Sequence, residues 1–446
     1  MTSTSGNRET QSMLLNIGPS HPAMHGVIRL ITELEGETVV KVEAEIGYLH
    51  RAFEKSCEES SWTQSIPYTD RLNYVSPLIN NFGYCGAVEK LLGIELTERC
   101  KYIRVIMSEV SRITDHLTCI AASAMELGAM TAFLYLMKAR EYLYDIVEEV
   151  TGARLTIAYG RIGGVKGDLP AGMEARLEEA LRKTEKEIEE VNLLLTRNRI
   201  WVDRTRDVGI LTKDNAISYA ITGPLARSAG INYDVRKAFP YLVYDRVDFD
   251  VPLGEQGDNY DRYMVRMEEM RQSIRIIRQC MKDIPDGSVN TDWARDAIKS
   301  YDLVDQAKMG ETAGLVNVIS TVEPTLEGSE RPYHQRIMSK DKRVVLPNKG
   351  DTYGNIEGLM NHFKIVMDAH GIRPPKGDTY FAVEGANGEL GFYVVSDGKD
   401  RPYRVRCRPP CFFGMAGLHT MLEGYMVADI VATFGSINMI AGELDR

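Results

Sequence analysis

The residues best suited to chemistry lie close together near the N-terminus, in a stretch at 18–26 that reads GPSHPAMHG. Its two imidazoles, His21 and His25, are side chains that exchange protons near neutral pH. Pro22 stands between them and would break a helix, because its ring removes an N–H and clashes with the preceding turn. The pair therefore differs from a zinc-binding His-x-x-x-His pair on one helix. Two interpretations stay open: a rigid loop that directs an imidazole into a cavity, or a tight turn whose histidines bond only to nearby backbone.

Glu126 is a second candidate, because it is an acid in the otherwise apolar stretch 125–130, MELGAM. It is either a surface charge at a helix bend or a buried acid that orients, or exchanges protons with, a histidine. The residues alone leave both interpretations open.

Cysteine usage argues against a metal site or a disulfide framework in this chain. The seven cysteines are an odd, scattered set, and the only close pair is Cys407 and Cys411. Zinc or an iron–sulfur cluster needs further thiolates or a mixed set of four ligands, and no second pair exists. We interpret the pair as structural and expect no bound metal.

Composition sets further limits. The 446 residues carry a net charge of −10 with no basic block, which argues against nucleic acid as a partner. No apolar run is long enough to span a bilayer, and residues 1–12 lack the apolar core of a signal peptide. We expect a disordered arm over 1–12 and a soluble or peripheral protein on the cytoplasmic side.

The elements that must position these residues indicate an α+β fold that is mostly helical. Residues 13–46 predict a small antiparallel meander, in which Val40, Val42, Ala44 and Ile46 alternate with charged residues. Apolar spacing predicts two helices in 101–151, the second ended by Gly152, and further helices at 173–198 and 263–284. Together they predict a central antiparallel helix bundle within 47–285.

The C-terminal part, 286–446, predicts mixed strands, a final helix and a tail. Strands are expected at 316–320, 380–384 and 390–395, followed by a basic, proline-bearing stretch at 396–410 and one helix over 417–433. Because no repeat or low-complexity linker divides the chain, 13–446 is expected to be a single composite domain.

Several segments, taken together and in order, resemble the 49 kDa subunit family of respiratory complex I, the proton-pumping NADH–quinone oxidoreductase. The resemblance covers the chain from about residue 14 to its end. The segments that carry it are 18–26, 46–51 (IGYLHR), 54–55 (EK), 70–74 (DRLNY), 128–131 (GAMT), 163–164 (GG), 260–263 (YDRY), 266–271 (RMEEMR) and 445–446 (DR).

That family is similar to the large subunit of nickel–iron hydrogenases, which hold their metal with two Cys-x-x-Cys pairs. The first pair falls on Asn73 and Ser76 here, and the second on Ile440 and Glu443. All four thiolates are absent, so the chain cannot hold that metal centre. The resemblance implies a hydrogenase-large-subunit-like fold with a metal-free cavity between the first helical segment and the C-terminal tail, where quinone is reduced.

The resemblance also implies the site residues. His25 and Tyr74 are the expected donors to the two quinone oxygens, and Met130 is expected to contact quinone; by itself, Tyr74 reads as a packed aromatic of the bundle. Glu126 stands where the family usually carries an Asp paired with the loop histidine. Arg51 and Lys166 are expected near the iron–sulfur cluster, and many relatives place a histidine at the position of Lys166.

The implied cofactors and partners lie outside this chain. Electrons are expected from a four-iron four-sulfur cluster in a partner subunit, and quinone is the substrate; ubiquinone and menaquinone both stay open. The expected partners are that iron–sulfur subunit, a separate 30 kDa-type subunit and a membrane-arm subunit at the entrance of the quinone channel. The protein is expected on the cytoplasmic side of the inner membrane, bound peripherally.

Other functions stay open from the sequence. One is the same quinone module in a sister complex fed by a deazaflavin coenzyme or ferredoxin. Another is a non-catalytic scaffold for the cluster subunit. A hydrogenase is disfavoured by the missing thiolates.

Overall fold

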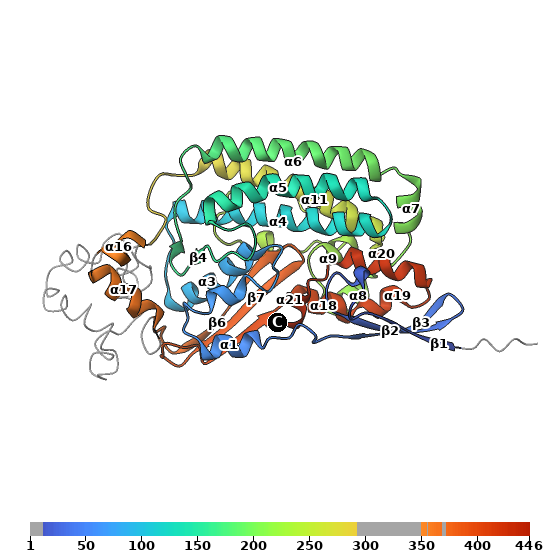
Figure 1. The fold of residues 1–446 in the computed structure, drawn as a ribbon, viewed down its shortest axis with the longest axis horizontal. Coiled ribbons are helices and arrows are strands. Elements are labelled where there is room, and N and C mark those ends of the chain that lie inside the picture. Colours follow the sequence, from blue (N-terminus) through green and yellow to red (C-terminus); the bar gives the residue numbers. More distant parts are fainter. Residues whose placement is uncertain (1–11, 292–348, 355, 368–371) are drawn as a thin grey trace, which may run out of the picture.

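Four long helices form the bundle that the sequence predicts. The computed structural model describes residues 12–291, 349–354, 356–367 and 372–446. The bundle helices are α4 (Glu98–Glu126), α5 (Met130–Thr151), α6 (Met173–Leu195) and α11 (Asn259–Asp283). Each of α4 and α6 packs against both α5 and α11, so the four close into a ring around a shared apolar core. Figure 1 shows them as an upper layer, with the sheets and the C-terminal helices beneath.

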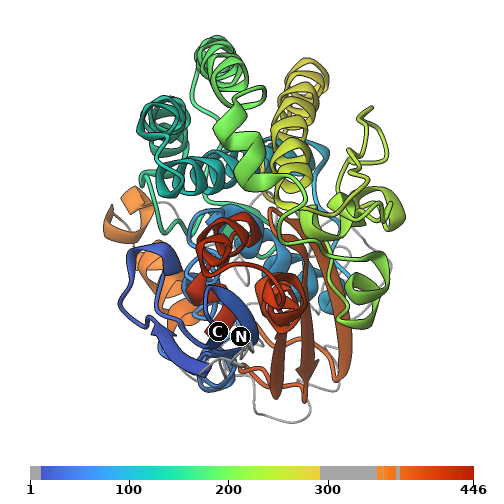
Figure 2. The ribbon, with the colours of Figure 1, turned by 90° about the vertical axis from the view of Figure 1, so that its right-hand side faces the viewer.

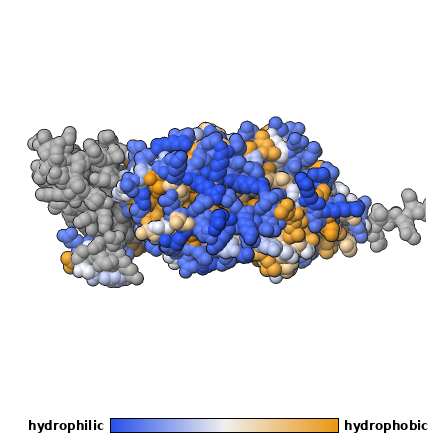
Figure 3. Space-filling model, turned by 90° about the horizontal axis from the view of Figure 1, so that it is seen from above, coloured by the Kyte–Doolittle hydropathy of each residue, from blue (hydrophilic) through white to orange (hydrophobic). Residues whose placement is uncertain are grey.

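The ends of the bundle helices follow from local sequence. The Thr97 side chain accepts a hydrogen bond from the Cys100 N–H at the start of α4. Gly152 ends α5 in the left-handed conformation, at φ 85°, as predicted. The outer face of the bundle is largely hydrophilic (Figure 3), as expected for helices with one buried stripe.

The predicted N-terminal meander is present, but its last strand is not regular. Strands β1 (Ser12–Ile17), β2 (Arg29–Glu35) and β3 (Thr38–Glu45) pair antiparallel in that order. The register shifts so that Val40 is an extra residue on β3, opposite the step from Glu33 to Leu34. Val39 and Val42 are therefore buried and Val40 is 44% exposed. The predicted alternation of Val40 with Val42 on one buried face is wrong, because this bulge intervenes.

The C-terminal sheet lies against a helix that glycines allow to come close. Strands β6 (Gly377–Gly385), β7 (Gly388–Ser396) and β8 (Arg404–Arg408) pair antiparallel in sequence order. They pack under α3 (Pro77–Leu92), where a Cβ at Gly86 would lie 2.5 Å from the Phe381 ring. The strands expected at 380–384 and 390–395 are confirmed, and β8 was not foreseen. The strand expected at 316–320 lies outside the described residues.

The single final helix predicted over 417–433 is wrong. The chain instead forms α18 (Pro410–Ala416), α19 (Leu418–Leu422), α20 (Val427–Ile437) and α21 (Ala441–Asp445). Gly424, at φ 88°, breaks the helix, and the backbone there pairs with Val39 of β3 through two hydrogen bonds. The helix ends here because the non-helical backbone at 424–425 hydrogen-bonds to the edge of β3.

Shorter elements connect these parts. They are the one-turn 3-10 helix η1 (Pro22–Met24), α1 (Phe53–Glu59), α2 (Ile66–Thr69), β4 (Gly160–Arg161), β5 (Gly164–Val165), α7 (Arg199–Thr205), α8 (Lys213–Ser218), α9 (Pro224–Ser228), α10 (Val235–Ala238), α16 (Lys349–Gly354) and α17 (Ile356–Val366). Seen end-on in Figure 2, the bundle fans out above the C-terminal helices, with the N-terminal sheet below them. No helix among the described residues combines the length and apolarity needed to cross a bilayer.

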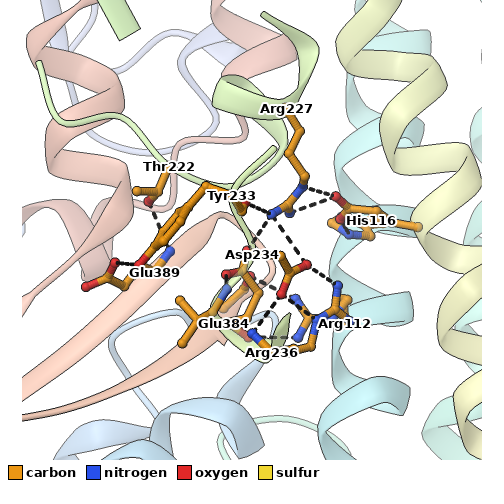
Figure 4. A network of polar contacts seen from close by, with 12 residues as sticks. Arg112, His116, Thr222, Arg227, Tyr233, Asp234, Arg236, Glu384 and Glu389 are labelled. Atoms are coloured by element: carbon orange, nitrogen blue, oxygen red, sulfur yellow. Dashed lines mark hydrogen bonds and ion pairs between the residues drawn. The ribbon is translucent and has the colours of Figure 1, made fainter. Parts of the chain in front are cut away.

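A buried ionic network joins the bundle to the C-terminal sheet (Figure 4). Arg227 of α9 lies 2.7 Å from a Glu269 carboxylate oxygen on α11 and 2.8 Å from one of Glu384 on β6. The other Glu269 oxygen lies 2.8 Å from His116 Nε2 on α4. Burial alone would raise the pKa of Glu269, but the Arg227 charge and the His116 hydrogen bond outweigh it and lower the pKa. One guanidinium therefore compensates two buried carboxylates on different layers.

Replacing Arg227 with methionine is expected to lower the free energy of unfolding of the full chain by about 3–5 kcal/mol, because two buried carboxylates lose their cation. Urea denaturation measures it. The control is Arg176→Met, which removes an exposed pair with Glu149 and is expected to cost about 1 kcal/mol or less. Equal losses in the two variants would show that the network does not hold the layers together.

Candidate functional site

The two histidines of the 18–26 stretch have different surroundings. Pro22 starts the 3-10 turn η1, where its missing N–H costs nothing. His21 precedes the turn, and its Nδ1 accepts a hydrogen bond from the Ala23 N–H at 3.2 Å. His21 is therefore an exposed histidine that bonds to nearby backbone, and only His25 faces the interior.

His25 is held toward the end of α4 by both backbone and packing. It ends the turn in the left-handed conformation, at φ 46°, while Ala23 and Met24 anchor the turn in the apolar core beneath. Its Nε2 lies 2.8 Å from Oε1 of Glu126, and its ring meets the Phe434 ring edge-on. The oxygen stands off the direction of an ideal N–H bond, so the contact is a close ion pair rather than an aligned hydrogen bond.

Glu126 is mostly buried, with 8% of its side chain exposed, at the last residue of α4. Its second carboxylate oxygen, Oε2, has no hydrogen-bond partner in the described part of the chain. Gly435 of α20 lies beside that oxygen, because a Cβ there would stand 3.2 Å from Oε2 and 3.6 Å from the His25 ring. A buried carboxylate with a free oxygen next to an imidazole is suited to holding or passing a proton.

Tyr74 lies in the irregular segment between α2 and α3. Because α2 ends at Thr69, Arg71 and Tyr74 do not share a helical face. The ring is half-buried and packs against the same apolar core as Ala23 and Met24. Burial raises the pKa of Tyr74, and the nearby Cys411 and Asp115 raise it further. The phenol therefore keeps its proton at neutral pH and is available as a donor.

The C-terminal tail brings the loop and Tyr74 to one place. A Cβ at Gly26 would lie 2.9 Å from the Ala441 side chain. A Cβ at Gly442 would lie 2.6 Å from the Arg71 carbonyl oxygen and 3.4 Å from the Tyr74 ring. Two consecutive tail residues thus contact the segment that carries His25 and the segment that carries Tyr74.

Three of the four positions that the sequence analysis set against the hydrogenase thiolates, Asn73, Ser76 and Glu443, belong to a buried hydrogen-bond network around Asp115 of α4. Its two carboxylate oxygens accept hydrogen bonds from Asn73 at 2.8 Å, Ser76 at 2.7 Å and Asn438 at 2.8 Å. Asn438 also donates to Asn387 at 2.6 Å. The side chains that donate to Asp115 are therefore all neutral.

Glu443 completes this network at the start of α21. Its carboxylate oxygens contact the Cys411 backbone N–H at 3.4 Å and the Cys411 thiol at 3.2 Å. Burial raises the pKa of Glu443 to about 7. Cys407 and Cys411 are both free and buried. Among the described residues, no group of three or more His, Cys, Asp or Glu is arranged to hold a metal ion.

The other predicted site residues do not contact the His25–Glu126 pair. Met130 begins α5, close to Glu126 in sequence, and is 53% exposed. Arg51 is exposed and donates to the Tyr68 carbonyl at 2.9 Å; burial and the Arg71 charge lower the pKa of Arg51. Lys166 donates to the Thr151 carbonyl at 3.0 Å, at the opposite end of α5 from Met130. The length of that helix separates its two ends by roughly 33 Å.

An open groove of about 390 Å³ lies beside the C-terminus, between the tail and the segment 46–58. We call it the C-terminal groove. Asp445 fixes one wall by accepting hydrogen bonds from the backbone N–H groups of Gly47 and Leu49. His25 and Tyr74 do not line it. The lining residues are Ile46, Gly47, His50, Ala52, Glu54, Lys55, Glu58, Arg404, Phe412, Leu444, Asp445 and Arg446.

Comparison with known proteins assigns a family. The model of the respiratory-chain NADH dehydrogenase 49 kDa subunit family matches residues 126–446. The chain belongs to this family. Its relatives include the NADH-quinone oxidoreductase D subunit of Myxococcus xanthus, 49% identical over 98% of this chain and 94% of that one. The D subunit of Pelobacter propionicus is also 49% identical, over 97% of this chain and 95% of its own length. The C/D subunit of Bdellovibrio bacteriovorus is 46% identical, over 97% of this chain and 68% of the relative.

The α+β fold is therefore that of a 49 kDa subunit, and the chain is a subunit of an NADH–quinone oxidoreductase. Sequence reasoning missed the Asp115 network. One signal was present: Asp115 is an acid between Ile113 and Leu117 in the most regular apolar stripe of the chain. Asn387 and Asn438 gave no such signal, since their partners lie far away in sequence.

Replacing Gly442 with alanine is expected to loosen the tail, because its Cβ would stand 2.6 Å and 2.8 Å from two fixed carbonyl oxygens. The expected cost is about 1–3 kcal/mol of local stability, measured by hydrogen exchange of the backbone amides of 439–446. The control is Gly354→Ala, because a Cβ there meets nothing within 4 Å. Unchanged protection in Gly442→Ala would contradict the tight docking of the tail.

Proposed function

We propose that this chain forms the quinone-reduction pocket of the oxidoreductase, together with an iron–sulfur partner subunit. The observation that carries the proposal is the convergence of the His25–Glu126 pair and Tyr74 on consecutive residues of the C-terminal tail. An ion-paired imidazole and a protonated phenol on one apolar core are suited to a flat, apolar acceptor that takes up protons as it is reduced.

The chemistry requires two electrons and two protons for each quinone. Glu126, 2.8 Å from His25 Nε2, holds the imidazole in place, and His25 gives a proton to one quinone oxygen. Tyr74 gives the second proton only when the reduced ring has become basic, because burial holds the phenol in its protonated form. After this transfer, Glu126 returns a proton to His25 or reorients its ring.

Apolar side chains beside Glu126 support a site for a lipid-like tail. Met125, Met130, Leu134 and Tyr135 lie around the bend between α4 and α5 and are 39%, 53%, 60% and 37% exposed. Exposed apolar residues grouped next to a functional pair are typical of a surface that a ligand or partner covers. We assign Met130 to quinone contact on this basis.

Electrons are supplied by a four-iron four-sulfur cluster of the partner subunit, and Arg51 and Lys166 act on that cluster as fixed positive charges. The C/D name of the Bdellovibrio relative supports a 30 kDa-type subunit as a further partner. A membrane-arm subunit contributes the entrance of the quinone channel, and the assembly lies on the cytoplasmic side of the inner membrane. The relatives' names favour NADH over a deazaflavin coenzyme or ferredoxin as donor.

The variants Tyr74→Phe and His25→Ala are each expected to lower quinone reductase activity of the assembled complex by about 100-fold or more, because each removes a proton donor. NADH oxidation by an artificial electron acceptor is expected to stay intact, since that reaction does not use the pocket. Both activities are measured on the same purified complex.

The control is Tyr219→Phe, which removes a hydroxyl beside the same apolar core, 3.2 Å from His419, and is expected to leave both activities unchanged. Normal quinone reduction in Tyr74→Phe and His25→Ala would instead support the scaffold alternative. Loss of both activities would indicate failed assembly.

Lys166 is expected to act on the cluster as a positive charge that does not change with pH. Its ammonium caps the negative end of α5 at the Thr151 carbonyl. A lysine stays charged across the physiological pH range, whereas a histidine at the same position titrates near pH ~6.5. The position therefore favours the reduced cluster equally at all working pH values.

In Lys166→His, the midpoint potential of the cluster is expected to become pH-dependent between about pH 5.5 and 7.5. Its slope stays below about 59 mV per pH unit, the limit for a one-electron couple. A redox titration at several pH values measures it, with Lys183→His on the outer face of α6 as control. Identical titrations of the native and Lys166→His complexes would refute the assignment.

A further inference from the structure

The network that replaces the hydrogenase metal site contains two buried carboxyl groups and no cation among its described members. Asp115 is 0% exposed and Glu443 is 1% exposed. The side chains that join them are Asn438, Asn387 and Cys411, all neutral. Two negative charges joined only by neutral side chains in one buried site are strongly unfavourable, so the pair is expected to hold one proton.

The surroundings of the two carboxyl groups decide where that proton lies. Asp115 accepts three short hydrogen bonds from amide and hydroxyl donors, at 2.7–2.8 Å. Glu443 receives longer contacts, from Cys411 at 3.2 Å and 3.4 Å, and it also interacts with the Asn387 side chain. The difference in environment makes Asp115 the fixed charge and Glu443 the acid, as in other carboxyl pairs with separated roles.

This pair lies near Tyr74, and Cys411 connects the two, because it contacts Glu443 and lies close enough to Tyr74 to raise its pKa. Asn73 and Ser76 both donate hydrogen bonds to Asp115, and Tyr74 lies between them in the sequence. Gly442, the residue before Glu443, packs on the Tyr74 ring. The nearby Cys411 and Asp115 raise the pKa of Tyr74 beyond the effect of burial, so these groups share one electrostatic environment. Negative charge formed on Tyr74 therefore acts on the proton of Glu443.

We propose that Glu443 is the proton store of the pocket and reprotonates Tyr74 after each turnover, with Asp115 as the fixed charge that keeps Glu443 protonated at rest. This inference rests on the proposed function. In the step, the Tyr74 O–H bond breaks as its proton passes to the quinone oxygen. The Glu443 carboxylic acid then gives its proton to the Tyr74 phenolate. The resulting carboxylate recovers a proton from water at the C-terminal groove, which the next residue, Leu444, lines.

Competing proton donors around Glu443 are few among the described residues. The titratable and charged groups around it are the Cys411 thiol of α18, the Cys407 thiol of β8, Asp115 of α4 and, beside Cys407, the Arg446 guanidinium. Burial raises the pKa of both thiols well above their ordinary value, so neither loses a proton at neutral pH. Burial, reinforced by Asp115, raises the pKa of Glu443 to about 7. The acid form is present below that pH and is lost as the pH rises through it.

The test is Glu443→Gln in the assembled complex. Glutamine is neutral and has the same shape as the protonated acid, so a merely structural role predicts normal behaviour. The proton-store role predicts that kcat for quinone reduction falls by about tenfold or more, while KM and binding of a quinone-site inhibitor stay unchanged. In infrared difference spectra, the C=O band of a protonated carboxyl group that titrates near pH 7 is expected in the native complex and not in Glu443→Gln.

Two further variants make the result decisive. Glu443→Asp keeps a carboxyl group and is expected to recover part of the lost kcat. Glu187→Gln replaces another buried glutamate, one that pairs with Lys138 in the bundle, and is expected to leave kcat unchanged. Native kcat in Glu443→Gln overturns the inference, as does the absence of the titrating band from the native complex, which can be measured even if the variant does not assemble.

The outcomes also separate this inference from the proposed function. If Tyr74→Phe is inactive and the inhibitor binds, but Glu443→Gln is normal, the quinone pocket stands and the proton store is wrong. If Tyr74→Phe is active, the pocket assignment itself is wrong.

Discussion

Buried charge that no metal ion balances is the constraint on which the structure around the tail depends. The Asp115 carboxylate accepts hydrogen bonds from Asn73, Ser76 and Asn438, three neutral donors from two parts of the chain. Asn438 is the donor to Oδ1, so removing it would leave that buried acceptor unsatisfied, at a cost of about 1–3 kcal/mol. The network therefore fixes the segment before α3, the middle of α4 and the tail relative to one another, as ligands around a metal would.

Because of that anchoring, the catalytic candidates cannot move independently. The tail contacts the loop that carries His25 where Ala441 meets Gly26, and it contacts the Tyr74 ring at Gly442. A ligand that displaces the 18–26 loop therefore pushes on the tail, and through the tail on Tyr74. The glycines at both ends of the loop are suitable hinges for such a motion. The ion pair between His25 and Glu126 is the contact that such a motion would break first, since it is not an aligned hydrogen bond.

Local features of this chain could be predicted from sequence wherever local physics decides them. The apolar spacing of α4 and the glycine that ends α5 gave helices at nearly the observed places. Val40 and Gly424 show where such reasoning stops. The bulge at Val40 and the helix break at Gly424 are both set by pairing of β3 with other segments. A pattern within one segment carries no information about that pairing.

In the candidate site, too, sequence reasoning fails where contacts between distant segments decide the arrangement. Residue types alone left His21 and His25 equivalent, and only the fold distinguishes the one that bonds to backbone from the one that meets Glu126, far along the chain. The family resemblance supplied Glu126 and Tyr74 as residues to examine. The Asp115–Glu443 network stayed hidden because its members come from separate segments of the chain, and most of the groups that join them are amides or a hydroxyl, which sequence patterns do not mark.

The length of α5 also divides the chemistry of the molecule in two. Met130 and Glu126 lie at one end, and Lys166 holds the carbonyl of Thr151 at the other, roughly 33 Å away. Charges separated by several Debye lengths of about 8 Å barely interact through solvent. A fixed charge at Lys166 therefore leaves the protonation of His25 almost untouched. Lys166 and the His25–Glu126 pair are thus kept apart by the length of one helix.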